Sequence, residues 1–203
     1  MPVFLDDKPY AATAAKLGEL LDAVRESPGQ HRRLIVEVNV SGHPLAGDAL
    51  VAELERDIAE DEVRLVSADA GQIAVEALGA VRTSVDEIAN LHQQAADMLQ
   101  AGDDATGLAT VGRVVELWAG VQSAVGQSAE VAGIDLNTLT VEDKLATDLI
   151  AGLLDQLRAL RDLIQSGDTV ALADALAYEW AETTAAWGDL VETLLHRIEH
   201  AAT

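Results

Sequence analysis

The residues with the clearest capacity for chemistry form the run His196-Arg197-Ile198-Glu199-His200. Its H-x-x-E-H spacing places two imidazoles one helical turn apart beside a carboxylate, which can bind zinc and supply a general base. A catalytic zinc ion needs a third protein ligand, and only three residues of this sequence follow His200. The competing role is electrostatic, because cationic side chains complement the negative end of a helix dipole. We expect the electrostatic role and no bound metal, and zinc at His196, Glu199 and His200 is the weaker alternative.

Aromatic residues and their polar neighbours form the second candidate site. Five residues in two apolar-periodic runs compose it, namely Trp118, Tyr178, Glu179, Trp180 and Trp187. A tryptophan buries so much apolar area that core packing is its usual role, with the indole N–H bonded to a nearby acceptor. The candidate acceptors are Glu179, Thr183 and Thr184. A small-molecule or catalytic pocket lined by the five residues is the alternative to packing.

Other catalytic and cofactor-binding signatures are missing from the sequence. It contains no G-x-G-x-x-G, no G-x-x-x-x-G-K-[ST] and no G-x-S-x-G. Di-iron sites in helical bundles use Glu-x-x-His, which does not occur here, and the absence of cysteine excludes disulfides and thiolate metal sites. His31, His43 and His92 are isolated, and we expect them at surface or turn positions. No cofactor is expected, and an enzyme has no positive support in the sequence.

Net charge is the strongest global property of the chain. Its 203 residues carry 35 acidic and 13 basic side chains, a formal charge of −22, with an isoelectric point near 4.3. Such a field repels a phosphate backbone and an anionic membrane surface, so we expect neither nucleic-acid nor membrane binding. A basic protein partner fits the charge, although a solvated acidic surface is its simplest explanation. Residues 84–203 hold 20 of the acids and 5 of the bases, so the C-terminal part is the more acidic.

The sequence predicts a cytoplasmic location. Its first residues, Met1-Pro2-Val3-Phe4-Leu5-Asp6-Asp7, lack the basic and apolar regions of a signal peptide. No apolar run approaches the roughly 18 residues that a membrane-spanning helix requires.

The elements that position the candidate residues begin with a helical hairpin that occurs twice. Leu99-Gln100-Ala101-Gly102-Asp103 recurs 65 residues later as Ile164-Gln165-Ser166-Gly167-Asp168. We predict that Gly102 and Gly167 follow helix ends with positive φ, because glycine has no Cβ to clash in that conformation. The aspartate after each glycine can cap the next helix by accepting its free N–H groups. Two such hairpins make a bundle of four helices.

Apolar spacing predicts the inner face of each helix in this bundle. The first helical run is long, and Gly79 or residues 82–84 are the places where it would kink. The third helix is expected to open at Thr140 as N-cap, with acidic residues in its first turn. Four glycines between 107 and 126 each cost up to about 1 kcal/mol relative to alanine, so we expect close packing there. The second helix is expected to face inward at Leu108, Val111, Val115, Trp118, Val121 (or Gln122) and Val125. The third is expected to do so at Leu145, Leu149, Leu153, Leu157 (or Gln156), Leu160 and Ile164.

The first 69 residues predict a small α/β unit that also contains a duplication. Residues 3–10 align with residues 38–45 at an offset of 35, and both fit a strand, a polar turn and a proline-marked exit. Ser41-Gly42 is a good hairpin turn, and Asp6-Asp7 is a weaker version. Strands are predicted at 34–40 and 62–66 from their alternating apolar residues. Helical spacing follows each hairpin, first at Leu17, Leu20, Leu21 and Val24 and then at Leu50, Leu54 and Ile58.

Together these elements predict an α+β protein with a small mixed αβ unit at 1–69 and an acidic four-helix bundle of two repeated hairpins at 70–203. In helix number and charge the bundle resembles the small acidic helical chaperones that guard secreted or assembling subunits, although no motif carries a functional residue over. The preferred function is therefore a non-catalytic interaction, adaptor or chaperone-like protein with a protein partner. A homodimer is one option for its assembly.

Overall fold

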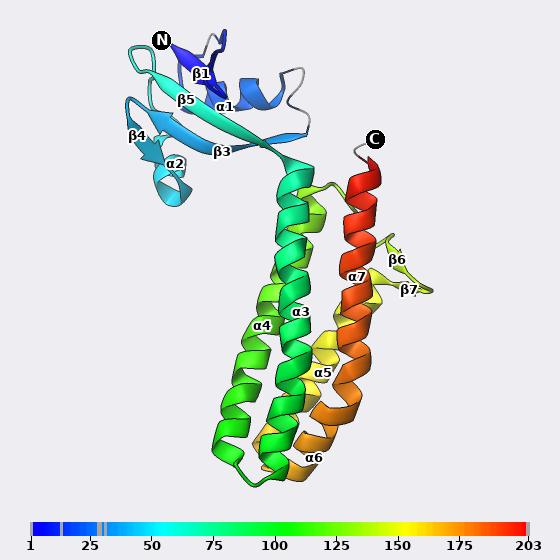
Figure 1. Ribbon diagram of the computed structural model, residues 1–203. Helices are drawn as coiled ribbons and strands as arrows, with labels where there is room; N and C mark the ends of the chain where they lie inside the picture. The colour runs from blue at the N-terminus through cyan, green and yellow to red at the C-terminus, as the bar shows by residue number, and fades with distance from the viewer. Residues whose placement is uncertain (1, 13, 28–29, 31, 202–203) are drawn as a thin grey trace. The chain divides into compact units, whose positions relative to one another are not determined.

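The computed structural model describes residues 2–12, 14–27, 30 and 32–201. The chain divides into two compact units, Met1–Ile73 and Ala74–Thr203. The first is built on a mixed β-sheet and the second on long helices, so the predicted α+β fold class is confirmed (Figure 1).

The first unit contains a five-stranded sheet with the strand order β2-β1-β5-β3-β4. Its strands are β1 (Val3–Leu5), β2 (Lys8–Pro9), β3 (Arg33–Val40), β4 (His43–Leu45) and β5 (Val63–Asp69). Strand β1 pairs parallel with β5, whereas the other neighbours pair antiparallel, which makes the sheet mixed. The strands predicted at 34–40 and 62–66 correspond to β3 and β5.

The two hairpins of this sheet share their conformation as well as their sequence pattern. Turn residues 6–7 and 41–42 all have positive φ, between 51° and 86°, as type I′ turns require. Equivalent strand residues also pair, Phe4 with Pro9 in the first hairpin and Asn39 with Pro44 in the second. The offset of 35 therefore relates two copies of one hairpin.

Helix α1 (Leu17–Arg25) packs its apolar side against the sheet, as its spacing predicts. Helix α2 (Gly47–Glu53) is shorter than predicted, and none of its residues is buried. The single helical face expected at Leu50, Leu54 and Ile58 is therefore wrong, because Ile58 is buried from the segment after the helix.

The start of α1 explains why α2 stops where it does. The N–H groups of Leu17 and Gly18 donate to the carbonyls of Arg56 and Leu54, at 3.1 Å and 2.8 Å. The first turn of a helix has free N–H groups that need such acceptors. Chain that bonds to α1 in this way cannot continue the helical hydrogen bonds of α2.

A polar network fastens the first hairpin to the sheet. The backbone N–H and the hydroxyl of Ser67 donate to the Asp6 carboxylate at 2.7 Å and 2.8 Å, and Arg33 lies 3.3 Å from the same carboxylate. Burial alone raises the pKa of Asp6, but these hydrogen bonds and the Arg33 charge outweigh it and lower the pKa below its ordinary value. Asp6 is therefore held in its ionised form.

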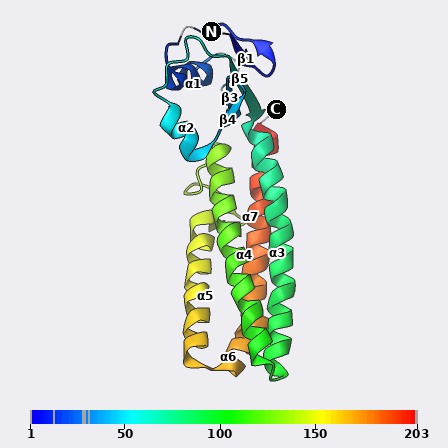
Figure 2. The same ribbon diagram turned by 90° about the vertical axis from the view of Figure 1, so that its left-hand side faces the viewer.

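The second unit consists of long helical segments that lie side by side around one apolar core (Figures 1 and 2). Its helices are α3 (Ala70–Gln100), α4 (Asp104–Val131), α5 (Ala146–Ser166), α6 (Thr169–Asp174), the π-helix η1 (Ala175–Glu179) and α7 (Trp180–Ala201). Helix α3 continues through Gly79 and residues 82–84 without a break. Every one of these segments contributes buried side chains to the core. Examples are Leu78, Trp118, Leu153, Leu172, Leu176 and Leu190.

The two glycine–aspartate corners of the helical unit are equivalent in detail. Gly102 and Gly167 have φ values of 81° and 72°, so the predicted left-handed helix ends are confirmed. Asp103 and Asp168 each cap the following helix through a side-chain oxygen that accepts a backbone N–H three residues later. The two N···O distances are 3.3 Å and 3.0 Å. The two five-residue segments therefore share the glycine conformation and the aspartate cap, although α4 is 28 residues long and α6 only six.

A hairpin precedes α5 where the sequence predicted a helix start. Strand β6 (Thr140–Val141) pairs with β7 (Lys144–Leu145), and Glu142 in the turn has a φ of 52°. Leu139 and Val141 are buried with Thr140 exposed between them, an alternation that a strand provides and a helix does not. The predicted N-cap at Thr140 is therefore wrong.

Helix α4 faces inward along a line that differs from the predicted one at two positions. Leu108 and Val115 are more than a third exposed, whereas Gly107 and Val114 are buried. Gly107 does permit close packing, because a Cβ there would lie 2.8 Å from the Leu99 side chain. The glycines at 112, 120 and 126 have no neighbouring heavy atom within 4 Å of that position, so the close packing predicted for them is wrong. Leu145 and Ile164, which were expected on the core-facing side of the third helix, are also exposed.

Candidate functional site

The three tryptophans meet in the core of the helical unit. Trp118 comes from α4, Trp180 and Trp187 come from α7, and all three are buried. The ring centroid of Trp118 lies 6.1 Å from that of Trp180 and 5.5 Å from that of Trp187, with the second pair edge to face. Such separations give favourable aromatic contacts in addition to the buried area. The cluster therefore joins α4 to α7.

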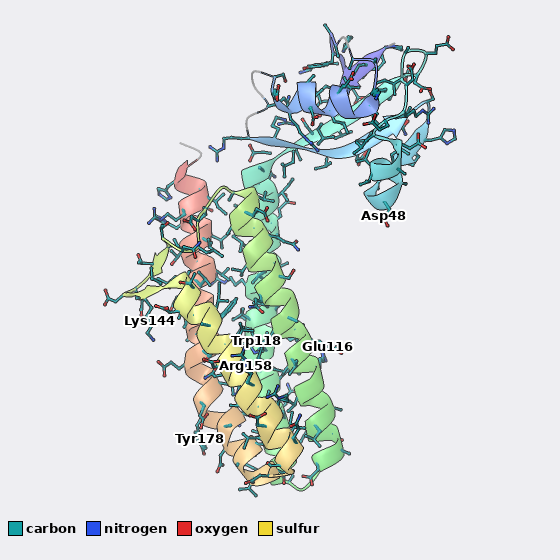
Figure 3. All side chains as sticks on the ribbon, turned by 180° about the vertical axis from the view of Figure 1, so that it is seen from behind. Asp48, Glu116, Trp118, Lys144, Arg158 and Tyr178 are labelled. Carbon is teal, nitrogen blue, oxygen red and sulfur yellow. The ribbon has the colours of Figure 1, made fainter. Side chains whose placement is uncertain are left out.

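The predicted polar neighbours of Trp180 lie outside this cluster. Tyr178 is 75% exposed, and Figure 3 shows it at the edge of the helical unit while Trp118 lies within. Glu179 is also exposed. Successive residues of a helix point in directions about 100° apart, so residues next to a buried tryptophan need not share its face. The structure brings the three tryptophans together and leaves Tyr178 and Glu179 on the surface.

Polar groups around the tryptophans are only partly paired. The Thr184 hydroxyl donates to the carbonyl of Trp180, and the Thr183 hydroxyl donates to Oε1 of Gln156. The indole N–H groups of Trp118 and Trp187 have no acceptor among the described residues. The acceptors expected for these two indoles are therefore wrong, because neither threonine oxygen lies within hydrogen-bond distance of an indole N–H and Glu179 is exposed.

His92 is the residue that the sequence analysis missed. It was expected at the surface, yet it is 3% exposed, and its ring centroid lies 4.8 Å from that of Trp180. Neither of its ring nitrogens has a hydrogen-bond partner in the described part of the chain. Burial lowers the pKa of His92 from 6.5 to about 4, because the cationic form loses its hydration. The imidazole is therefore neutral near pH 7, and each unpartnered nitrogen costs about 1–3 kcal/mol.

A signal in the sequence does exist for this position. The inner face of α3 follows alternating steps of three and four residues, and His92 occupies one of its positions. The buried residues at these positions are Val81, Val85, Ile88, His92, Ala95 and Leu99. The pattern is that of a and d positions in a heptad, so a histidine there is buried whatever its polarity.

The first of two grooves beside α7 lies over His92, between α3 and the η1–α7 segment. This α3–α7 groove has a volume of about 370 Å³. Five of its eleven lining residues are alanine or glycine, and Val85 and Leu176 complete its apolar lining. The five are Ala89 on α3 with Ala177, Ala181, Ala185 and Gly188 on η1 and α7. His92, Thr184, Gln93 and Asp86 supply its polar groups.

A second groove lies on the other side of α7, against α5. This α5–α7 groove has a volume of about 330 Å³ and is lined by three carboxylates, those of Asp148, Glu179 and Glu182. Its apolar lining comes from Leu149, Leu153, Ala186 and Trp187. Lys144 is the basic residue of its lining, and its ammonium group lies 4.0 Å from Glu182. Two of the five residues of the predicted aromatic site, Glu179 and Trp187, therefore line one groove.

The C-terminal histidines interact with each other. The rings of His196 and His200 stack with centroids 3.9 Å apart, and both residues are exposed. Nδ1 of His200 lies 2.8 Å from the His196 carbonyl, to which its N–H form donates. Glu199 is exposed on the same turn, and within residues 2–12, 14–27, 30 and 32–201 no group of three acidic or histidine side chains has the arrangement of a metal site. His43 is exposed in β4, and His31 lies outside the described residues.

Comparison with protein-family models, curated proteins and solved structures finds no match to this chain. Among the described helices, none combines the length and the apolar composition needed to cross a membrane.

Proposed function

We propose that the protein is a non-catalytic interaction protein, and that its helical unit binds a basic segment of a partner protein in the α5–α7 groove. The observation that carries the proposal is the lining of this groove, where three carboxylates accompany apolar side chains, the partly exposed Leu149 and Ala186 together with the buried Trp187. A helix with basic residues on one side and apolar residues on the other matches such a surface.

The position of the carboxylates supports recognition of cations. Glu179 and Glu182 are exposed one turn apart on η1 and α7, and Asp148 faces them from α5. Lys144 neutralises part of this charge through Glu182, and it is the base that an incoming lysine or arginine would displace. An exposed ion pair of this length contributes little stability, so its exchange for a partner's cation costs little.

The charge of residues 84–203, which make up most of the helical unit, supports the same partner class. Residues 84–203 carry 20 acidic and 5 basic side chains. A field of this sign accelerates association with a basic protein and opposes nucleic acids and anionic membranes. The groove would provide the specific binding site for a basic partner that this charge attracts.

The chemistry available in the groove is that of binding. Its polar side chains offer ion pairs and hydrogen bonds, and its apolar side chains offer contact area. The hydroxyl of Thr183 is already bonded to Gln156, and that of Thr184 to a backbone carbonyl. Ion pairs around an apolar centre are the usual composition of a protein interface.

Charge reversal in the groove tests the proposal. The variant Glu179→Lys/Glu182→Lys is compared with Glu116→Lys/Glu130→Lys, which makes the same charge change at exposed positions of α4. Glu116 lies across the helical unit from Lys144 in Figure 3. Each full-length protein is used to capture partners from an extract of the native cells, followed by mass spectrometry. A fluorescently labelled helical peptide with lysine on one face and leucine on the other serves as a defined probe.

The groove variant should lose the captured partner and bind the peptide at least about tenfold more weakly, a difference of about 1.4 kcal/mol. The α4 variant should retain both, and higher salt should weaken binding by the native protein. Equal loss in the two double variants would mean that net charge alone attracts the partner. Retention by the groove variant would refute the proposed site.

A further inference from the structure

The α3–α7 groove joins two independent features that the proposed function does not use. Alanine and glycine residues, with Val85 and Leu176, form the apolar part of an open groove about 370 Å³ in volume. Among its lining residues is His92, which is 3% exposed and has two ring nitrogens without a partner among the described residues. Ligand sites are commonly apolar clefts of about 300–1,000 Å³ with a few fixed polar groups. The groove has this composition.

Rotation about the Cβ–Cγ bond would change which ring atoms of His92 face the groove that it lines, without movement of the backbone. Both nitrogens are shielded in the present orientation of the ring. Rotation by about 180° around the Cβ–Cγ bond exchanges each nitrogen with a ring carbon, while the ring occupies nearly the same space. This rotation keeps the plane of the ring and therefore its contact with Trp180, whose ring centroid lies 4.8 Å away.

The lining also defines the chemistry of a ligand. Alanine and glycine walls fit a flat apolar body, because their short side chains leave the space beside the helices open. Asp86 lines the groove, and none of its lining residues in the described part of the chain is a lysine or arginine, so an anion is disfavoured. A neutral imidazole has one nitrogen that donates and one that accepts. A hydroxyl group can bond to either nitrogen, since it both donates and accepts.

We propose that the α3–α7 groove binds a small uncharged molecule that has a flat apolar body and one hydroxyl group, with the hydroxyl bonded to His92. This site is separate from the α5–α7 groove, and the proposal does not depend on a protein partner. The groove is accessible in the chain as it stands, since Ala89, Ala181 and Ala185 are exposed.

Phenol and toluene are the matched probes, because a methyl group replaces the hydroxyl and the ring is the same. Binding is measured by NMR on full-length protein labelled with ¹⁵N at histidine, through the imidazole nitrogens. The variant His92→Phe identifies the His92 signals and keeps an aromatic ring beside Trp180. Phenol should shift the His92 nitrogens and bind about tenfold more tightly than toluene, which corresponds to about 1.4 kcal/mol.

Three further comparisons make the result specific. His92→Phe should bind phenol no better than toluene, because the hydrogen bond is gone. Ala185→Leu fills the groove from an exposed wall position and should weaken both probes, whereas Ala119→Leu on the exposed face of α4 should weaken neither. Benzoate, which has the same ring and a negative charge, should bind more weakly than phenol.

Several outcomes would overturn the proposal. Equal affinity for phenol and toluene would remove the role of the hydroxyl, and unshifted His92 nitrogens would remove the role of the imidazole. Phenol binding that survives Ala185→Leu would place the site elsewhere. Because this leucine is added at the surface, loss of folding is not expected, and the circular dichroism spectrum of each variant verifies it.

Discussion

Replacement of His92 by leucine should remove part of the acid sensitivity of the protein. The folded state holds the pKa of His92 at about 4, against an ordinary value of 6.5. Between pH 6.5 and 4, His92 is therefore protonated in the unfolded chain and mostly neutral in the folded chain. The free energy of unfolding falls as the pH drops through this range. Leucine has a similar volume and no titrating group, so it keeps the a/d packing of α3 without this effect.

The size of the effect follows from the difference between the two pKa values. A shift of one unit corresponds to about 1.36 kcal/mol, so the complete effect is about 3 kcal/mol. At pH 5 most of the unfolded chains carry the proton and few folded chains do, which gives about 2 kcal/mol relative to pH 7.5. The native protein should thus lose about 2 kcal/mol more than His92→Leu between these two pH values.

Urea unfolding followed by tryptophan fluorescence measures this difference directly, because all three tryptophans are buried in the same unit. The carboxylates titrate in both proteins, and subtracting one pH dependence from the other cancels their contribution. His43→Gln is the matched control, since His43 is exposed, and it should keep the pH dependence of the native protein. Equal losses in the native protein and His92→Leu would show that His92 is not held neutral by burial.

Other predictions follow from the turns, the polar network and the core. Gly167→Ala should destabilise the folded protein by about 1 kcal/mol, because Gly167 has a φ of 72°. Gly120→Ala should stabilise it, because Gly120 lies within a helix and has open space around it. Thermal melting of the two variants distinguishes backbone strain from a general effect of replacing glycine. Asp6→Asn should lower the free energy of unfolding by about 1–3 kcal/mol near pH 7. Because folding lowers the pKa of Asp6, the difference in stability from the native protein should shrink as the pH falls below about 4. Denaturation curves that stay equally far apart in acid would exclude the ionic role. A chain that begins at Ser84 lacks the buried Ala74, Leu78 and Val81 and should melt early or aggregate, whereas a cooperative transition at the native temperature would show that these residues are dispensable. Zinc added to chelator-treated protein should leave the melting temperature unchanged, and a rise that His200→Ala abolishes would reveal a metal site.

The parts of the fold that could be predicted are those governed by local rules. Glycine at a helix end and aspartate after it act within one turn, so Gly102, Gly167 and their capping aspartates were predictable from five-residue patterns. The hairpin at Ser41-Gly42 was predictable for the same reason. At Thr140 two local rules competed, and burial of Leu139 and Val141, which depends on the rest of the unit, favoured a strand.

The candidate site depended more on packing between distant segments. Burial of the tryptophans followed from their spacing, but the pairing of their indole groups did not, since Thr184 bonds to its own helix backbone. His92 was misplaced because polarity was given more weight than its position in the a/d series of α3. The two grooves could not be predicted at all, because each is made by residues more than twenty positions apart on helices whose separation only the folded chain defines.

The duplicated hairpin has a consequence for how the sheet meets other proteins. The sheet order places β2 at one margin and β4 at the other, and these are the return strands of the two copies. Each is only two or three residues long and contains a proline, Pro9 or Pro44, which has no N–H to offer a further strand. Unprotected sheet margins recruit strands from other chains and lead to aggregation. The two similar hairpins thus place a short strand with a proline at each margin, which disfavours strand addition at β2 and β4.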